Sequence, residues 1–300
     1  MNQRQDNTSG GTPDIERSWL SVDLAPILSG SYEPPKPTVG QRSDGIGLFY
    51  RGKVHSVASA SEAGKTWLLL AAAFQEIKAE KHVAYIDFED SAAGMVGRLL
   101  TFGLAPEVIG YYFHYIQPTQ PYTSTVHRTD LFQNVIWEHC PTLVVIDGIT
   151  EAMTTHGLKS NDNDDIAWFS KIFPREIAHS APEPATVCLD HVVKNADGPS
   201  RYALGGVHKL NQIDGAAYVL ELRDPFGIGV TGRSAILLAK DRPGQLRKHG
   251  LRRKDGLTDF GELVIESHDE AYTEFEITPA VARGGGFPAN HRYGQDQRGV

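Results

Sequence analysis

Cysteine is scarce in this chain. Only Cys140 and Cys188 occur among its 300 residues. Small secreted domains held together by disulfides are dense in cysteine, so the composition excludes that class and favours a reducing, cytoplasmic compartment. Both cysteines lie near apolar runs, which predicts buried thiols with a packing role.

Long hydrophobic runs are also absent. No apolar stretch approaches the ~20 residues that a transmembrane helix requires. Residues 1–14 are polar and lack the apolar core of a signal peptide. We therefore expect no membrane association.

Positive charge is in deficit, since 29 Lys and Arg residues stand against 37 Asp and Glu residues and the formal net charge is −8. Proteins that coat duplex DNA are usually basic, so this balance argues against broad electrostatic capture of nucleic acid. It leaves room for a local basic surface or for a solvated basic edge near the end of the chain. The basic residues there are Arg233, Lys240, Arg242, Arg247, Lys248, Arg252, Arg253 and Lys254.

Strand and helix patterns alternate through the middle of the chain. This alternation predicts an α/β fold with a mostly parallel central sheet flanked by helices, and a ligand site at the carboxyl ends of the strands. Later segments have the pattern of successive strands and predict an antiparallel extension. The expected strands are residues 82–88, 112–117, 142–147, 185–190, 216–222, 232–240, 245–252 and 262–267, and the expected helices are 18–28, 92–102, 129–139 and 164–180. Residues 48–60 are expected to form a hairpin-like entry.

The most informative segment connects an apolar run, residues 54–58, to a helical run, residues 67–77. It matches the phosphate-binding loop G-x-x-x-x-G-K-[ST] except that Ser59 replaces the first glycine. Backbone N–H groups and the positive end of the helix are expected to hold the phosphates of ATP. Lys65 would reach the β- and γ-phosphates, and the Thr66 hydroxyl would ligate Mg²⁺. The predicted nucleotide-binding residues are Ser59, Ala60, Ser61, Glu62, Ala63, Gly64, Lys65, Thr66 and Trp67.

Two carboxylates at strand ends are candidates for the hydrolytic chemistry. Asp147 ends the apolar run LVVID and is expected to hold Mg²⁺. Gly148 follows it, so a catalytic glutamate cannot stand directly after this aspartate. Glu89, after the strand 82–88, is the candidate that orients the attacking water. The alternative makes Glu89 and Asp90 helix N-terminal carboxylates favoured by the dipole.

Three more residues are candidates for sensing or stabilising the γ-phosphate. His191 follows the strand 185–190 and would face the phosphate edge of the site, although a lone histidine is more often structural. Lys240 and Arg242 lie one residue apart, so they project the same way from a strand and both can reach one phosphate. A basic turn is the alternative for this pair.

These segments together resemble the RecA-like AAA-type P-loop ATPases of plasmids and phages, the group with RepA-type and DnaB-type hexameric replicative helicases. The resemblance spans about residues 48–250 and is carried by SEAGKTW, YIDFED, LVVIDG, the His191 segment and KDRPG. It implies a RecA-like ATPase domain over residues 46–270. Residues 1–45 would be a disordered N-terminus, short helix and linker, and residues 271–300 a flexible tail.

The same resemblance implies a homo-oligomeric ring, hexameric or similar, that hydrolyses ATP between subunits. Lys240 and Arg242 would enter the neighbouring subunit's site, and His191 would report the γ-phosphate. Residues 196–211 and 149–165 would line a channel for single-stranded DNA, with 196–211 the better candidate and ordinary surface loops the alternative. A second hypothesis is an ATP-dependent regulatory switch or loader that controls a replication or recombination partner without unwinding DNA.

Overall fold

The computed structural model describes residues 20–192 and 206–281 of the chain. The chain divides into two compact units, residues 1–34 and 35–300. The described part of the first unit contains the π-helical turn η1 (Ile27–Ser31), in which no side chain is buried. We expected a helix over residues 18–28, so the helical turn begins later in the sequence than predicted.

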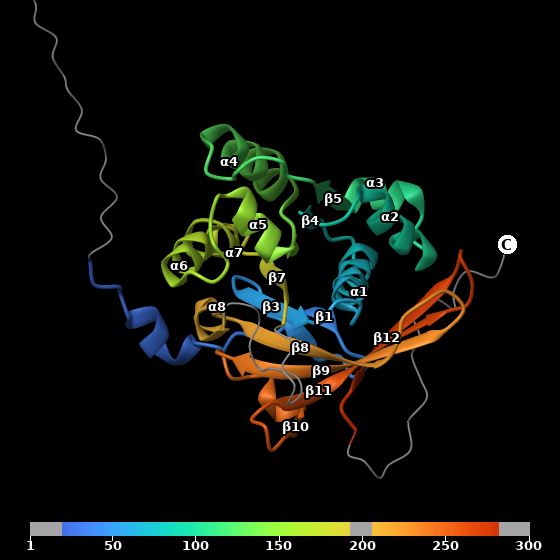
Figure 1. The fold of residues 1–300 in the computed structure, drawn as a ribbon. Coiled ribbons are helices and arrows are strands. Elements are labelled where there is room, and N and C mark those ends of the chain that lie inside the picture. The colour runs from blue at the N-terminus through green and yellow to red at the C-terminus, as the bar shows by residue number, and fades with distance from the viewer. Residues whose placement is uncertain (1–19, 193–205, 282–300) are drawn as a thin grey trace, which may run out of the picture. The chain divides into compact units, whose positions relative to one another are not determined.

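A ten-stranded sheet forms the frame of the second unit (Figure 1). Its strands from β8 to β5 are parallel, and β9, β10, β11 and β12 pair antiparallel. This is the mostly parallel α/β arrangement with an antiparallel extension that the sequence predicted. The strands across the sheet are β10 (Leu251–Arg252), β11 (Thr258–Ser267), β9 (Thr231–Asp241), β8 (Ala216–Asp224), β3 (Val54–Ser59), β7 (Ala185–His191), β6 (Leu143–Asp147), β4 (Val83–Asp87) and β5 (Phe113–Ile116), with β12 (Thr273–Pro279) paired to β11.

Helices cover both faces of the parallel part. Successive strand residues point to opposite faces, so Val83 and Tyr85 of β4 pack in one core cluster while Ala84 and Ile86 pack in the other. Helices α1, α2 and α3 contribute to the first cluster, and η2, α5, α6 and α7 to the second. The helices are α1 (Lys65–Lys78), α2 (Ala92–Thr101), α3 (Pro106–Tyr112), α4 (Thr125–Leu131), η2 (Phe132–Trp137), α5 (Ile149–Thr155), α6 (Asn163–Ile172), α7 (Pro174–His179), α8 (Gly206–Gln212) and η3 (Arg247–His249).

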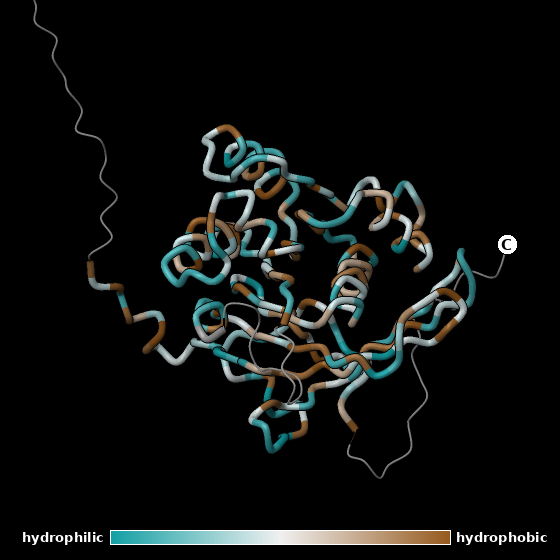
Figure 2. The backbone as a smooth tube through the Cα atoms, viewed as in Figure 1, coloured by the Kyte–Doolittle hydropathy of each residue, from teal (hydrophilic) through white to brown (hydrophobic). Residues whose placement is uncertain are grey.

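Hydrophobic residues concentrate on α1 and the central strands (Figure 2). The β6 strand is buried at every position, and so is β4. Strands covered on both faces are expected to be apolar throughout, which explains the continuous hydrophobic runs in the sequence. Within the described residues, no helix combines the length and apolar character needed to cross a bilayer.

The entry to the sheet differs from the predicted hairpin over residues 48–60. Strand β2 (Gly47–Phe49) pairs antiparallel with β1 (Val39–Gln41), and β3 pairs with β7 and β8 instead. The apolar pattern located both strands but not their partners, because the partners of β3 lie far away in the sequence.

The C-terminal region also differs from expectation. Residues 245–252 contain the 3₁₀ turn η3 and the two-residue strand β10 rather than a full strand. We expected a flexible segment from residue 271, yet β12 pairs with β11 along its whole length, from Thr273 to Pro279. Apolar Phe275 and Ile277 alternate with polar residues in this segment, which is a local sequence signal that could have revealed the strand.

Two smaller expectations are wrong. The helix expected over 164–180 is broken into α6 and α7 at Phe173, because Pro174 has no N–H to continue the helical ladder and instead opens α7. Cys188 is buried as predicted, but Cys140 is exposed. Cys140 follows the helical segment that η2 belongs to, with a positive φ of 49°, and lies at the surface before β6 begins.

Candidate nucleotide-binding site

Four parallel strands end at the same edge of the sheet. Ser59 of β3 pairs with His191 of β7, and Asp147 of β6 pairs with Asp87 of β4. In the same register Asp147 lies beside Leu189, two residues before His191. The strand ends therefore bring the phosphate-loop strand and three polar side chains to one edge, where ligands bind in open α/β sheets.

The loop from β3 to α1 has the backbone of a phosphate cradle. Gly64 is the N-cap of α1 with φ 84°, in the left-handed region that favours glycine. A Cβ added to Gly64 would also lie 2.7 Å from the Phe226 ring, so a side chain is excluded twice over. Glu62 also has a positive φ, 62°. The first amides of α1 follow this turn directly and are free to face an anion.

The backbone conformation of Ser59 explains why the loop can form without the usual first glycine. It is the last residue of β3, is fully buried, and has an ordinary strand backbone rather than a left-handed one. Its hydroxyl donates to the Ala60 carbonyl at 2.6 Å. Glycine's conformational freedom is therefore not needed here, and serine supplies a local hydrogen bond instead.

The Lys65 ammonium group lies at the carboxyl ends of strands β3 and β7. Its Nζ lies 3.3 Å from His191 Nδ1 and 3.5 Å from the Ser59 carbonyl. Burial lowers the pKa of Lys65, and the nearby Asp147 and Glu89 carboxylates oppose that shift only in part. Within the described part of the chain Lys65 forms no ion pair, which leaves its charge available to a phosphate.

The other two loop-helix residues predicted to bind nucleotide lie in the first turn of α1. Thr66 is half-buried directly after Lys65. Trp67 packs its ring against Phe102, 5.5 Å between centroids, and the Arg98 guanidinium lies over it at 5.5 Å. Trp67 thus joins α1 to α2.

Asp147, the carboxylate that the sequence assigned to the metal, is buried at the end of β6. The Tyr85 hydroxyl donates to its Oδ2 at 2.6 Å. Burial raises the pKa of Asp147 to about 6, although the tyrosine hydrogen bond and Lys65 act in the opposite direction. Tyr85 lies on β4, so this contact fixes the carboxylate from the neighbouring strand.

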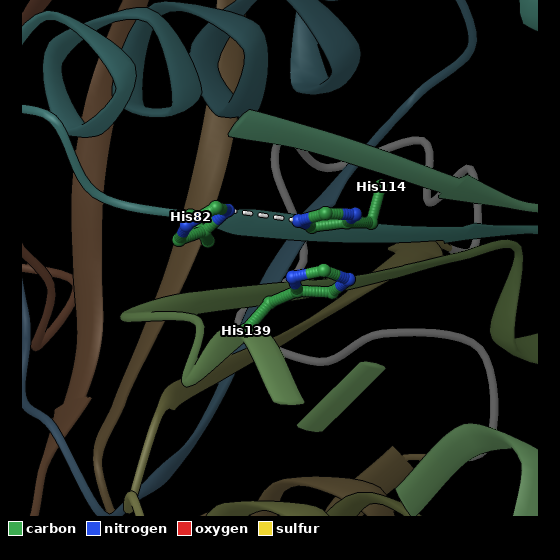
Figure 3. A group of neighbouring side chains, drawn as sticks. All are labelled: His82, His114 and His139. Atoms are coloured by element: carbon green, nitrogen blue, oxygen red, sulfur yellow. Dashed lines mark hydrogen bonds between the residues drawn. The ribbon is translucent and has the colours of Figure 1, made fainter. Parts of the chain in front are cut away.

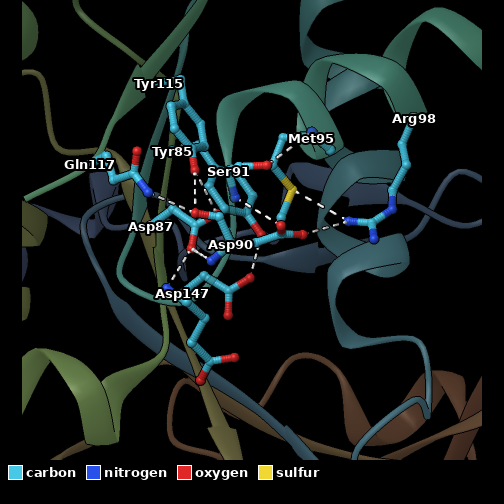
Figure 4. Close-up of polar contacts among 11 residues, drawn as sticks. Tyr85, Asp87, Asp90, Ser91, Met95, Arg98, Tyr115, Gln117 and Asp147 are labelled. Carbon is cyan, nitrogen blue, oxygen red and sulfur yellow. Dashed lines mark hydrogen bonds and ion pairs between the residues drawn. The ribbon is translucent and has the colours of Figure 1, made fainter.

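Asp87 organises the turn between β4 and α2, a role that the sequence did not reveal. Its carboxylate accepts the backbone N–H groups of Glu89 and Asp90 at 2.9 and 3.0 Å and the Tyr115 hydroxyl at 3.0 Å. Figure 4 shows this network, with Arg98 reaching Asp90 from α2. The alternative from the sequence made Asp90 a carboxylate at the helix N-terminus, and it lies one residue before the N-cap of α2, Ser91, whose N–H its carboxylate accepts.

Glu89 faces a second carboxylate, Glu151, in the first turn of α5. Burial first, and then the neighbouring Glu151 and Asp147 carboxylates, raise the pKa of Glu89 to about 8. The buried Glu151 Oε2 has no hydrogen-bond partner among the described residues. The Glu89 Oε1 also lies 3.5 Å from His191 Nε2.

Gly148 permits this close approach. A Cβ on Gly148 would lie 2.5 Å from both Cγ and Oε1 of Glu89 and 2.7 Å from Glu151 Oε2, and its φ is 78°. In the sequence Gly148 indicated only where a catalytic glutamate could not be. In the structure, the lack of a side chain at Gly148 leaves room for Glu89, which follows β4. Two strands, β6 and β7, lie between β4 and β3, the strand that precedes the phosphate loop.

Lys240 and Arg242 lie away from the loop of their own chain. Lys240 of β9 pairs with Ala217 of β8, and Ala217 pairs with Ser56 of β3. Lys240 therefore lies at the level of Ser56, three residues before the end of β3. Its Nζ donates to the carbonyls of Leu210 and Asn211 at the end of α8, at 2.7 and 3.3 Å. Arg242 is exposed. Neither side chain therefore completes the phosphate edge of its own subunit.

The loop expected to bind DNA falls mainly outside the described residues, which omit 193–205. Its last part, from Gly206, begins α8. There Lys209 Nζ forms a 2.8 Å ion pair with the buried Asp190, the neighbour of His191. The other candidate loop, residues 149–165, forms α5 and the start of α6.

The donor set at this edge fits Mg²⁺. Asp147 and Glu89 have raised pKa values, and Lys65 is the cation that moderates both. Such crowding of carboxyl oxygens is relieved by a hard divalent cation, which prefers oxygen ligands. The Thr66 hydroxyl, one residue beyond Lys65, completes the set that the sequence named.

The free energy of unfolding of the ligand-free protein is expected to fall as pH rises from about 4.5 to about 8. Glu89 has its pKa raised from 4.5 to about 8, so in this window the folded chain retains a proton that the unfolded chain has released. The stability contributed by the protonated carboxyl is complete below pH 4.5 and lost by pH 8. Asp147 acts in the same direction between 3.8 and about 6.

Urea unfolding at pH 6, 7 and 8 measures this dependence. In Glu89→Gln, the fall in the free energy of unfolding between pH 6 and 8 should be about 1 kcal/mol smaller than in the wild type. This difference is less than full linkage gives, because the Glu89 side chain is one-third exposed. Glu107→Gln, on the exposed surface of α3, is the matched control. Identical profiles for the wild type and Glu89→Gln would contradict the raised pKa of Glu89.

Comparison with known proteins identifies the fold. Neither the protein-family models nor the curated protein sequences give a match. Among solved structures, the chain is similar to the KaiC-like protein PH0186 from the hyperthermophilic archaeon Pyrococcus horikoshii OT3. The TM-score is 0.56 at 12% identity, over 82% of this chain and 100% of that one. The chain therefore has a RecA-like P-loop fold, as the sequence predicted, and this likeness distinguishes no finer group.

Proposed function

We propose that this protein is an ATP-hydrolysing, ring-forming RecA-like motor that acts on single-stranded DNA, in the manner of a RepA-type helicase or translocase. The observation that carries the proposal is the convergence of Lys65, Glu89, Asp147 and His191 at one strand edge beside a phosphate cradle. ATP hydrolysis needs a phosphate cradle, a metal, a water-orienting base and a cation, and these residues can provide them.

Each residue has a defined task in this proposal. Thr66 and Asp147 would hold Mg²⁺, which when bound neutralises phosphate charge. Lys65 binds the phosphates, and the Glu89 carboxylate orients the attacking water and accepts its proton. His191 lies between Lys65 and Glu89, at 3.3 and 3.5 Å, where it can respond to the presence of a γ-phosphate.

A path from His191 to the predicted DNA-binding segment supports coupling of hydrolysis to movement. His191 follows Asp190, whose ion pair with Lys209 ties the end of β7 to α8. Lys209 belongs to the predicted DNA loop, residues 196–211. A movement of His191 can therefore be transmitted to that loop through the backbone and through the ion pair between Asp190 and Lys209.

The expected result for the motor hypothesis is Mg²⁺-dependent ATP hydrolysis that rises severalfold on adding single-stranded DNA. A coupled phosphate-release assay with and without an oligonucleotide measures it, and Lys65→Ala supplies the background. Basal hydrolysis without stimulation would favour the regulatory switch or loader, which the net charge of −8 also favours. Absence of any hydrolysis would contradict both.

Arg242→Ala is expected to lower hydrolysis about 10³-fold while ATP binding persists, because an arginine supplied to a neighbour's site stabilises transition-state charge. Its exposure leaves it available to a second subunit. Mixing Arg242→Ala with Lys65→Ala subunits should restore part of the activity, since some interfaces then hold an intact pair. Arg252→Ala, another exposed arginine, is the control. Failure to restore activity would count against a shared site.

A further inference from the structure

Three histidines lie together, as Figure 3 shows. They lie near the amino-terminal ends of the parallel strands, whereas the nucleotide site lies at the carboxyl ends. His82 immediately precedes β4, His114 is the second residue of β5, and His139 lies between η2 and β6. Five residues of extended chain separate His82 from Asp87 at the phosphate edge, roughly 16 Å. The cluster is therefore a separate feature that ATP hydrolysis does not use.

The imidazoles are already close enough to share one ion. His82 Nδ1 and His114 Nε2 lie 2.9 Å apart, and the rings of His114 and His139 stack with centroids 3.9 Å apart and an interplanar angle of 12°. One ring nitrogen from each histidine lies within 4.8 Å of the other two. All three side chains are half-buried, so solvent and ions can reach them.

Their chemistry selects a particular class of ion. Burial and the neighbouring imidazoles lower the pKa of His82, and that of His114 to about 4, which keeps these rings in the neutral form that binds metals. Three nitrogen donors without a carboxylate suit Zn²⁺, Cu²⁺ or Ni²⁺ rather than Mg²⁺ or Ca²⁺.

We propose that His82, His114 and His139 form a binding site for one divalent transition-metal ion, with Zn²⁺ as its best-suited occupant. In a tetrahedral site with Zn–N bonds of ~2.0–2.1 Å, ligand nitrogens lie roughly 3.3 Å apart. The 2.9 Å pair needs only a small separation as the ion replaces the shared proton. His139 turns about χ2, a broad torsion, to aim its nitrogen at the same point. Water takes the fourth position.

A bound ion would stabilise β5, the last strand on one side of the sheet. Strand β5 has four residues and pairs with β4 alone among the described strands. The ion would link β5 to the segments before β4 and before β6, which are far apart in sequence. Binding only to the folded state raises its stability by mass action.

Isothermal titration of tag-free full-length protein with ZnCl₂ tests the proposal. We expect one zinc per chain at this site, and His114→Ala should weaken that binding by about 100-fold, at least as much as loss of an outer-shell partner does. His127→Ala, an exposed histidine on α4, is the matched control and should bind like the wild type. Millimolar Mg²⁺ should not compete.

Two further measurements keep the test decisive. Co²⁺ should give the visible absorption of a tetrahedral nitrogen site in the wild type and lose it in His139→Gln, a variant at a half-exposed position with little risk to folding. Zinc at 100 times its Kd should raise the Tm by about 5 °C in the wild type only. Equal zinc binding by wild type and His114→Ala would overturn the proposal. So would loss of binding in His268→Ala instead, because His268 belongs to another cluster with Glu266 and Glu274.

Discussion

Lys65→Ala is expected to weaken ATP binding by about 10- to 100-fold and to abolish measurable hydrolysis. A hydrogen bond to a charged partner contributes about 1.5–3 kcal/mol, and each 1.4 kcal/mol corresponds to tenfold in affinity. Lys65 is buried beside the strand edge, so neither solvent nor another cation in the described structure can replace its ammonium group there. The remaining carboxylates would also repel the triphosphate more strongly.

Lys78→Ala is the matched control, because Lys78 lies on the same helix, in its exposed last turn. Calorimetric titration with a non-hydrolysable ATP analogue and Mg²⁺ gives the affinity, and phosphate release gives the turnover. Normal binding by Lys65→Ala would remove the phosphate loop from the proposal and, with it, the role of every other residue in the site.

Glu89→Gln is expected to lower kcat by about 10²- to 10⁴-fold while ATP still binds. General-base catalysis contributes a factor of this size, and glutamine keeps the shape of the side chain but cannot accept a proton. In the ligand-free protein the pKa of Glu89 is raised to about 8, so the amide also resembles the protonated state of this side chain. Removal of a negative charge near the phosphates should leave ATP affinity equal or higher.

Rapid-quench measurement of a single turnover separates this effect from product release. Glu107→Gln again serves as the exposed control, and Glu151→Gln should reduce kcat less, because Glu151 acts through its contact with Glu89. Together, the two variants divide the site: Lys65→Ala loses binding, whereas Glu89→Gln loses the chemical step. Unchanged turnover in Glu89→Gln would transfer the role of base to another residue, with Glu151 the nearest candidate.

Local patterns predicted much of the site. The segment from Ser59 to Thr66 indicated a phosphate loop, and the apolar runs ending at Asp87 and Asp147 indicated buried parallel strands. Polar residues that follow such strands meet at one edge of the sheet, so the residue pattern was enough to predict that Glu89, Asp147 and His191 lie together. Even the unusual serine needed no correction, because a strand end imposes no positive φ.

The order of the strands decided the rest. Glu151, Tyr85 and Gly148 matter because β4 lies beside β6, and no spacing in the sequence encodes that neighbour. The three histidines are separated by 32 and 25 residues, and only the pairing of β4 with β5 and β6 unites them.

The sequence by itself thus determined which elements form and which strand ends carry polar groups, because these depend on residues near each other in the chain. Tertiary structure alone decided which carboxylate lies beside Glu89 and which imidazoles meet, because such contacts depend on strand neighbours that pack together only when the whole sheet has formed.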